Sequence, residues 1–330
     1  MEPRCLDTAG VREHCAVNQS GLQVGRLSGA MAPDNTEDAN METLSDILDD
    51  TTSFEKVATG FVFTEGPLWH PDGFFYFVDV RGNGLFRVTL GQPFEKIRET
   101  LGGNGLTFDL QGRLINCEGD GRRVTRTDLD GTVTTLIDRF EGKRLNRPND
   151  VICHSNGTLL FTDPSLRVPV AEREVESAMI YKIAPNGVVS ELAPFEYPNG
   201  LALSPDERTL YVANTRWAKY IHAIELDENC NMVRRRIFAD MSHDATNGVP
   251  DGMKVDAAGR VFCTGTTGTW VFTPDGKLIG IIETPEVCAN VAFGGPDLRT
   301  LLFTASTSVY TLRVNTPGLP HPWYARHGKT

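Results

Sequence analysis

The stretch LWHPDGFFYFVDV at positions 68–80 joins an apolar run, a polar turn and a β-rich run, and this order occurs six times along the chain. Alternation of β-branched or aromatic residues with polar ones, broken by Asp-Gly or Asn-Gly turns, is typical of antiparallel strands. The five later copies are LTFDLQGRLINCE (106–118), VICHSNGTLLFTD (151–163), LALSPDERTLYVAN (201–214), MKVDAAGRVFCTG (253–265) and VAFGGPDLRTLLFTA (291–305). The repetition predicts a fold of six equivalent β units.

Each copy has an oxygen-bearing side chain seven residues ahead of its turn, which we call the anchor. Successive anchors lie 39 to 52 residues apart, and they are Glu65, Asn104, Asn149, Asn199, Asp251 and Asn290. This period is that of a four-stranded propeller blade. Because blades repeat by rotation about a central axis, equivalent side chains should form a ring. We therefore predict an all-β, six-bladed β-propeller with the anchors around its channel.

The ends of the chain differ from the repeats. Residues 1–52 contain no Phe, Trp or Tyr and become acidic from position 34. Such a segment buries too little apolar surface to order itself, so we predict a disordered acidic extension, with a short helix in METLSDILDD (41–50). The propeller is predicted over 53–316 and a Pro-rich tail over 317–330. FEKVATGF (54–61) should close the propeller as the outermost strand of the last blade, because an open sheet edge is a liability.

Composition and sequence pattern limit the classes of binding partner and the cellular compartment that we expect. A net charge of −11 and a pI near 5.2 argue against a nucleic-acid partner. No apolar run reaches the ~20 residues of a membrane helix, and the N-terminus lacks the apolar core of a secretory signal. The seven cysteines contain no CxxC pair, which favours buried thiols in a reducing compartment. We expect a cytoplasmic protein without a membrane partner; its oligomeric state does not follow from the sequence.

The anchors predict a cation site. All six are Glu, Asn or Asp, and such hard oxygen ligands select Ca²⁺ first, with Mg²⁺, Mn²⁺ or Zn²⁺ as alternatives. Glu65 and Asp251 would balance the charge of one divalent ion. Asn149 and Asn199 bring neutral oxygens, and the other two anchors would complete the circle directly or through water or substrate. The alternative is that Asn and Asp before Gly are only turn formers, which does not explain Glu65.

Five motifs resemble the gluconolactonase family, which includes senescence marker protein (regucalcin) and luciferin-regenerating enzyme. They are FTEGPLW (63–69), LNRPNDV (145–151), YPNGLALSPD (197–206), VPDGMKVD (249–256) and NVAFGGPD (290–297). The resemblance covers roughly residues 54–314 and is greatest to bacterial-type gluconolactonases. It implies a six-bladed propeller with one catalytic divalent cation. By motif, Glu65, Asn199 and Asp251 match metal ligands, and Asn149 matches a residue that binds metal or substrate.

The resemblance implies a hydrolase that opens a small-molecule sugar lactone. A bound cation would polarise the carbonyl and lower the pKa of water. Asp251 also matches the family's proton acceptor, with Asp150 as the reserve base because a cation weakens a carboxylate as a base. We expect substrate contacts from Asn104, Asn149, Asn290 and Arg147. A structural ion pair is the alternative for Arg147.

Two other functions fit the same pattern. A phosphotriesterase of the diisopropyl-fluorophosphatase type shares the oxygen ring and the propeller. A non-enzymatic calcium-binding propeller is also compatible, because one fold hosts many functions. The chain has no GxSxG elbow, HExxH motif or P-loop, which disfavours serine, zinc-protease and nucleotide chemistry.

Overall fold

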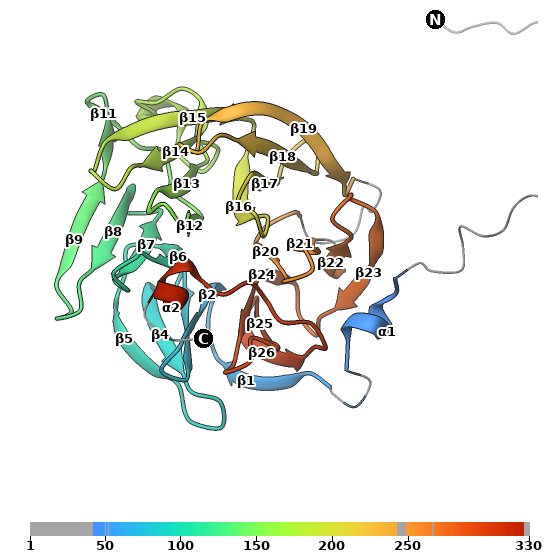
Figure 1. Ribbon diagram of the computed structural model, residues 1–330. Coiled ribbons are helices and arrows are strands. Elements are labelled where there is room, and N and C mark those ends of the chain that lie inside the picture. The colour runs from blue at the N-terminus through green and yellow to red at the C-terminus, as the bar shows by residue number, and fades with distance from the viewer. Residues whose placement is uncertain (1–41, 50, 52, 243–248, 266, 327–330) are drawn as a thin grey trace, which may run out of the picture. The chain divides into compact units, whose positions relative to one another are not determined.

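The computed structural model describes residues 42–326 except 50, 52, 243–248 and 266. Six four-stranded antiparallel sheets are arranged as blades around a central channel (Figure 1). The predicted six-bladed β-propeller is confirmed. The first 41 residues of the predicted disordered extension lie outside the described residues. No helix in the described part of the chain has the length and apolar character that crossing a membrane would require.

The blades follow one another along the chain, and each begins with its innermost strand. Blade 1 contains β2 (Thr64–His70), β3 (Phe74–Asp79), β4 (Gly84–Val88) and β5 (Glu95–Glu99). Blade 2 contains β6 (Gly103–Phe108), β7 (Leu114–Glu118), β8 (Arg123–Thr127) and β9 (Val133–Ile137). Blade 3 contains β12 (Val151–Cys153), β13 (Leu159–Asp163), β14 (Ala178–Ile183) and β15 (Val189–Phe195).

The second half repeats this order. Blade 4 contains β16 (Pro198–Leu203), β17 (Thr209–Asn214), β18 (Tyr220–Leu226) and β19 (Met232–Asp240). Blade 5 contains β20 (Met253–Val255), β21 (Val261–Gly265), β22 (Gly268–Phe272) and β23 (Leu278–Glu283). Blade 6 contains β24 (Cys288–Gly294), β25 (Thr300–Ala305), β26 (Ser308–Arg313) and β1 (Glu55–Thr59). The smaller elements are the pair β10 (Arg139–Phe140) and β11 (Lys143–Arg144), and the helices α1 (Leu44–Ile47), η2 (Val170–Glu172) and α2 (Pro322–Arg326).

Blade 6 joins the two ends of the propeller. Strand β1 pairs antiparallel with β26, with Glu55 opposite Thr311 and Thr59 opposite Ser308. The predicted closure is confirmed, because the outermost strand of the last blade comes from the segment just ahead of blade 1. This pairing protects the sheet edge of β26.

Burial falls from the channel outward. The inner strand β24 is buried at all seven positions, whereas the outer strand β5 is exposed at four of five. Inner strands are covered on both faces by neighbouring blades, so they read as apolar runs, while outer strands face water on one side. The core therefore lies between the blades.

Segments at both ends pack onto the propeller. Ile47 of α1 is fully buried in the cluster that contains Phe262 and Phe303, and its carbonyl accepts from Asn315 N at 2.7 Å. Residues ahead of the predicted boundary at residue 53 therefore pack onto the propeller. In the predicted tail, Trp323 and Tyr324 are 7% and 4% exposed.

We call residues 315–326 the C-terminal strap. It crosses one end of the channel, in red at the front of Figure 1. Gly318 N donates to Leu298 O of blade 6 at 2.9 Å, and Tyr324 OH donates to Trp69 O of blade 1. The strap thus spans the junction where the propeller closes.

Candidate functional site

The six anchors occupy equivalent places at the start of the inner strands. Four lie within the first three residues of their strand, and Asn149 and Asp251 lie two residues before β12 and β20. This is the placement that the repeat predicts. All six therefore belong to the same level of the channel.

Neighbouring anchors contact one another around the channel through glycines. A Cβ added at Gly66 would lie 2.2 Å from Asn104 O, and one at Gly105 would lie 2.8 Å from Asn149 O. Each glycine directly follows the anchor of its own blade. No side chain fits there, because the next blade's backbone occupies the space.

The same contact recurs on the other side of the channel. A Cβ at Gly200 would lie 2.1 Å from Asp251 O, and one at Gly252 would lie 1.9 Å from Asn290 Cγ. Glycine after an anchor is thus required by blade-to-blade approach. The alternative that Asn-Gly and Asp-Gly here serve only as turns does not account for these contacts.

Hydrogen bonds close the remaining two junctions. Asn290 Nδ2 donates to Glu65 Oε2 at 2.9 Å, which joins blade 6 to blade 1. Thr162 Oγ1 donates to Asn199 O at 2.9 Å, which joins blade 3 to blade 4. Contacts at the level of the anchors therefore join each blade to the next, and between blades 3 and 4 they run through Thr162.

Polar residues at the ends of the second strands hold the loops that carry the anchors. Asp163 accepts from Asn146 N at 2.8 Å and Arg147 N at 2.6 Å, just ahead of Asn149. Burial raises the pKa of Asp163 to about 7. In the same way, Asp79 accepts hydrogen bonds from Val62 N and Phe63 N ahead of Glu65. Asn214 accepts one from Tyr197 N ahead of Asn199.

These supports do not follow from the spacing of the anchors. Their signal is the polar residue that closes the copies FYFVD, LLFTD and LYVAN. A polar residue at the end of an otherwise buried strand needs partners, and here they are backbone N–H groups.

The two acids of the ring, Glu65 and Asp251, both have raised pKa values. Glu65 is 2% exposed, and burial raises its pKa. The pKa of Asp251 is raised well above its ordinary value, first by burial and then by the charge of Glu65. Arg167, in the loop after β13, opposes the rise for Asp251, and Lys254 opposes it for Glu65. A cation between the two carboxylates would favour their ionised forms.

Asn199 presents an acceptor to the ring. Thr215 Oγ1 donates to Pro250 O at 2.7 Å, so its single hydroxyl proton is used and it can only accept from Asn199. The atom that faces Thr215, at 2.8 Å, must therefore be Asn199 Nδ2. This leaves Asn199 Oδ1 buried, with no hydrogen-bond partner among the described residues. A buried acceptor without a partner is costly in free energy, and a cation would satisfy it.

The remaining predicted residues differ in how they are used. Asp150 accepts from Val151 N at 2.9 Å and Leu201 N at 2.8 Å, so both its oxygens brace blades 3 and 4. Arg147 is partly exposed and pairs with Asp120. Its ion pair is therefore with blade 2 and not with Asp150.

The three other asparagines also separate into two kinds. Asn290 donates to Glu65 and accepts from Val291 N at 2.9 Å, so both polar atoms of its amide have a partner. Asn104 and Asn149 are partly exposed. In the part of the chain that the structure describes, no three His, Cys, Asp or Glu side chains converge as a metal site. An ion here would need amide oxygens as well as the two acids.

Comparison with known proteins agrees with this geometry. Residues 63–307 match the SMP-30/Gluconolactonase/LRE-like region. The gluconolactonase of Zymomonas mobilis is 30% identical over 304 residues, covering 83% of this chain and 85% of that protein. The pentonolactonase of Haloferax volcanii is 31% identical over 253 residues, covering 73% and 81%.

The fold comparison gives the same result. The structure of a gluconolactonase from Xanthomonas campestris is 32% identical, has a TM-score of 0.77, and covers 83% of this chain and 94% of that one. The predicted family resemblance is thereby confirmed. Since the family match spans most of the propeller, this chain belongs to the SMP-30/gluconolactonase/LRE-like family.

Proposed function

We propose that this protein is a metal-dependent lactonase that opens a sugar lactone at the ring of anchors. Membership of a sugar-lactonase family supports lactone hydrolysis. The observation that carries the metal is the buried Asn199 Oδ1, which has no described partner and belongs to the ring that holds two acids. Carboxylate and amide oxygens without His or Cys are the ligands of a hard cation, Ca²⁺ first.

Four residues would hold the cation: Glu65, Asn149, Asn199 and Asp251. A cation held there supplies Lewis-acid polarisation of the lactone carbonyl and a lower pKa for the attacking water. Asn290 orients Glu65 through its amide N–H. Thr215 orients Asn199 by accepting from its Nδ2 at 2.8 Å.

Asp251 would act as the general base. It accepts a proton from water as the water oxygen bonds to the lactone carbonyl carbon. The ring C–O bond then breaks, and Asp251 returns the proton to the departing oxygen, which gives the open hydroxy acid. Asp150 remains the reserve base, but both its oxygens already accept backbone N–H groups.

Substrate hydroxyls would bind at the rim of the ring. Asn104 and Asn149 are partly exposed, and each amide offers a donor and an acceptor. Arg147, partly exposed beside Asp120, adds a cationic donor. Asn290 would act on the substrate through Glu65. Lactones of five- or six-carbon aldonic acids suit such a rim, and the relatives named gluconolactonase and pentonolactonase support this class.

Removal and return of the cation tests the proposal. Protein stripped with EDTA should lose acid release from sugar lactones, and refilling with Ca²⁺, Mg²⁺, Mn²⁺ or Zn²⁺ should restore it with at least one ion. Undiminished hydrolysis by fully stripped protein would overturn the metal dependence. The same preparations offered an organophosphate ester separate a lactonase from a phosphotriesterase.

We also propose that the protein is cytoplasmic. Five described cysteines are buried and form no disulfide: Cys117, Cys153, Cys230, Cys263 and Cys288. Buried cysteines without disulfides suit a reducing compartment.

A further inference from the structure

A chamber lies directly beyond the ring, on the side of the C-terminal strap. The inner strands line its wall with residues that come after the anchors in the chain, such as Leu68 after Glu65 and Lys254 after Asp251. The strap supplies Leu319, His321 and Tyr324 to the same wall. We call this space the lower chamber. Its volume of about 540 Å³ lies within the range of small-molecule sites.

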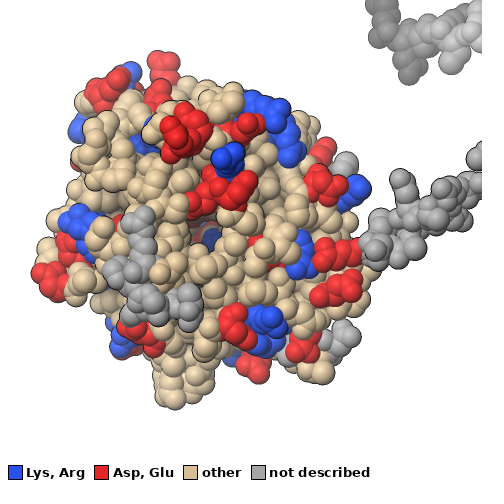
Figure 2. Space-filling model, viewed as in Figure 1, with Lys and Arg blue, Asp and Glu red and all other residues tan. Residues whose placement is uncertain are grey.

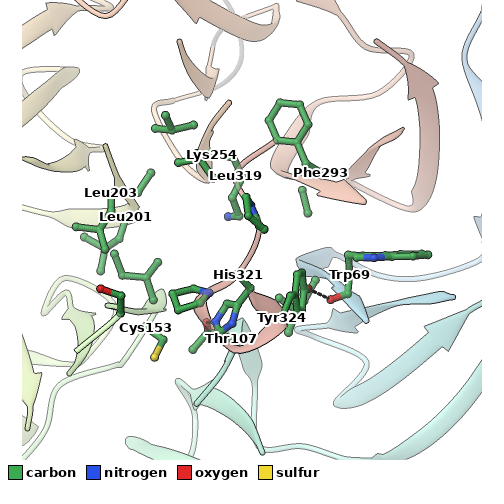
Figure 3. Close-up of a pocket in the computed structure, with 18 of the residues that line it drawn as sticks. Trp69, Thr107, Cys153, Leu201, Leu203, Lys254, Phe293, Leu319, His321 and Tyr324 are labelled. Atoms are coloured by element: carbon green, nitrogen blue, oxygen red, sulfur yellow. Dashed lines mark hydrogen bonds between the residues drawn. The ribbon is translucent and has the colours of Figure 1, made fainter. Parts of the chain in front are cut away.

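The wall of the lower chamber is mostly apolar. Figure 3 shows side chains of several blades and of the strap gathered around one space. The main apolar contributors are Leu68, Leu106, Leu201, Leu203, Phe293 and Leu319. Such a wall favours an apolar body over a sugar, because polar hydroxyls would lose water without gaining partners.

The polar groups of the strap are already engaged. Tyr324 OH donates to Trp69 O, drawn as a dashed line in Figure 3. The His321 ring lies 3.2 Å from Thr107 Oγ1. Burial lowers the pKa of His321 to about 3, so this ring is neutral and adds no charge to the chamber.

One cationic and one acidic side chain line the chamber, at different depths, and the charge of Lys254 also opposes the raised pKa values of Glu65 and Asp150 beside the ring. Of the described residues that line it, Lys254 is the one Lys or Arg, and Figure 2 shows a basic side chain at the floor of a central hollow on this face. The acid among the lining residues is Glu207, which accepts from Ser155 N at 2.9 Å. Ser155 and Glu207 belong to the turns of blades 3 and 4, so the acid lies at the rim and the cation at the floor.

Lys254 has donors to offer a ligand. Its Nζ donates to Met253 O at 2.9 Å, which uses one of the three N–H groups of the ammonium. An anionic head group would accept from the others and make a charge-assisted hydrogen bond, which is stronger than a neutral one.

We propose that the lower chamber is a second ligand site, which binds a small carboxylate with an apolar body, its head group at Lys254 and its body along the leucines. The site is separate from the proposed reaction, which takes place at the ring. Its occupant differs in kind from a sugar lactone, because it is recognised by one charge and by apolar contact.

Calorimetric titration of the cation-loaded full chain with octanoate tests this site. One octanoate should bind per chain. Octanamide, which has the same body without the charge, should bind at least about ten-fold more weakly. Lys254→Met should weaken octanoate by about the same factor, and Lys254→Arg should largely keep it. The matched control is Lys277→Met in the same blade, whose side chain is 79% exposed and which should change nothing.

The outcomes that overturn the proposal are equally specific. They are the absence of octanoate binding, equal binding of octanoate and octanamide, or full octanoate affinity in a folded Lys254→Met variant. If that variant fails to fold, Leu203→Trp replaces it as the test, because the larger side chain from blade 4 fills the chamber. Loss of octanoate binding in Leu203→Trp supports the site, and retention contradicts it.

Discussion

At the scale of single residues, the channel side chains differ in whether their polar atoms are already used. Both oxygens of Asp150 and both amide atoms of Asn290 have partners within the protein. Asn199 Oδ1 has none among the described residues. This difference separates side chains that brace the blades from side chains that can take a ligand.

Asp251→Asn tests the base. The amide cannot accept a proton from water, so we expect kcat for lactone opening to fall by about 10²–10⁴. The melting temperature should not fall, because the substitution removes one of two mutually repelling acids. Asp275→Asn, an exposed acid in the same blade, is the matched control and should keep full activity. Full activity in Asp251→Asn would contradict the assignment.

At the scale of elements, the inner strands are held at a fixed separation by the glycines that follow the anchors. Each glycine lets its strand approach the backbone or anchor of the next blade, and Gly200 against Asp251 is among the closest contacts. The loops ahead of the strands are fixed separately by Asp79, Asp163 and Asn214. The position of an anchor is therefore determined on both sides, before and after it in the chain.

Gly200→Ala tests this arrangement. Its Cβ would lie 2.1 Å from Asp251 O, so blades 4 and 5 must separate. We expect a loss of about 1–3 kcal/mol in the free energy of unfolding, and weaker cation binding. Gly121→Ala, whose nearest neighbour would be Leu101 Cβ at 3.2 Å, is the milder control. Chemical denaturation and cation titration of both variants measure the difference; wild-type values for Gly200→Ala would refute the packing argument.

The sequence predicts strands and anchors because both follow a period. Glu65 and its five counterparts occupy one frame of a repeat, and rotation alone brings them together. Trp323 and Tyr324 were not predicted to pack, because NTPGLPHPWYARHGKT has no strand period and their partners, such as Trp69, are far away in the chain. For the same reason the sequence did not reveal the lower chamber, which needs the strap beneath the channel.

At the scale of the whole molecule, the propeller is one closed object with its ends fastened together. Strand β1 completes blade 6, and the strap crosses from blade 6 to blade 1. Rotational closure brings acids from blades 1 and 5 close enough for the charge of Glu65 to raise the pKa of Asp251. The proposed function therefore depends on the junction at which the propeller closes.

A chain that begins at Glu65 tests the closure. It lacks β1 and Phe61, whose ring packs 5.1 Å from the ring of Phe77. We expect it to lose cooperative unfolding, since the edge of β26 is then exposed. A chain that begins at Glu42 keeps every described residue and should unfold like full length. If the chain from Glu65 also melts like full length, the closure does not stabilise the fold.

The pH dependence of stability tests the charge of the interior. Burial raises the pKa values of Glu65, Asp150, Asp251 and Asp163, the last to about 7. The folded protein then binds more protons than the unfolded chain, so the stability that these groups contribute is present below pH ~4 and lost as the pH rises towards 7. Cation-free protein should therefore lose free energy of unfolding between about pH 4 and 7.

A returned cation should reverse that loss near neutral pH, because it favours the ionised forms of Glu65 and Asp251. Acids whose pKa is lowered to about 2, such as Asp297, act in the opposite direction only at lower pH. Urea denaturation at several pH values, with and without Ca²⁺, measures both effects. A rise in the stability of the cation-free protein over this range would contradict the account.

The most direct test of the central claim is a crystal structure of the Ca²⁺-loaded protein with anomalous scattering. The account predicts one anomalous peak in the channel, with oxygens of Glu65, Asn149, Asn199 and Asp251 at about 2.3–2.6 Å from it. A channel without a peak, or a single peak bound elsewhere on the protein, would contradict it.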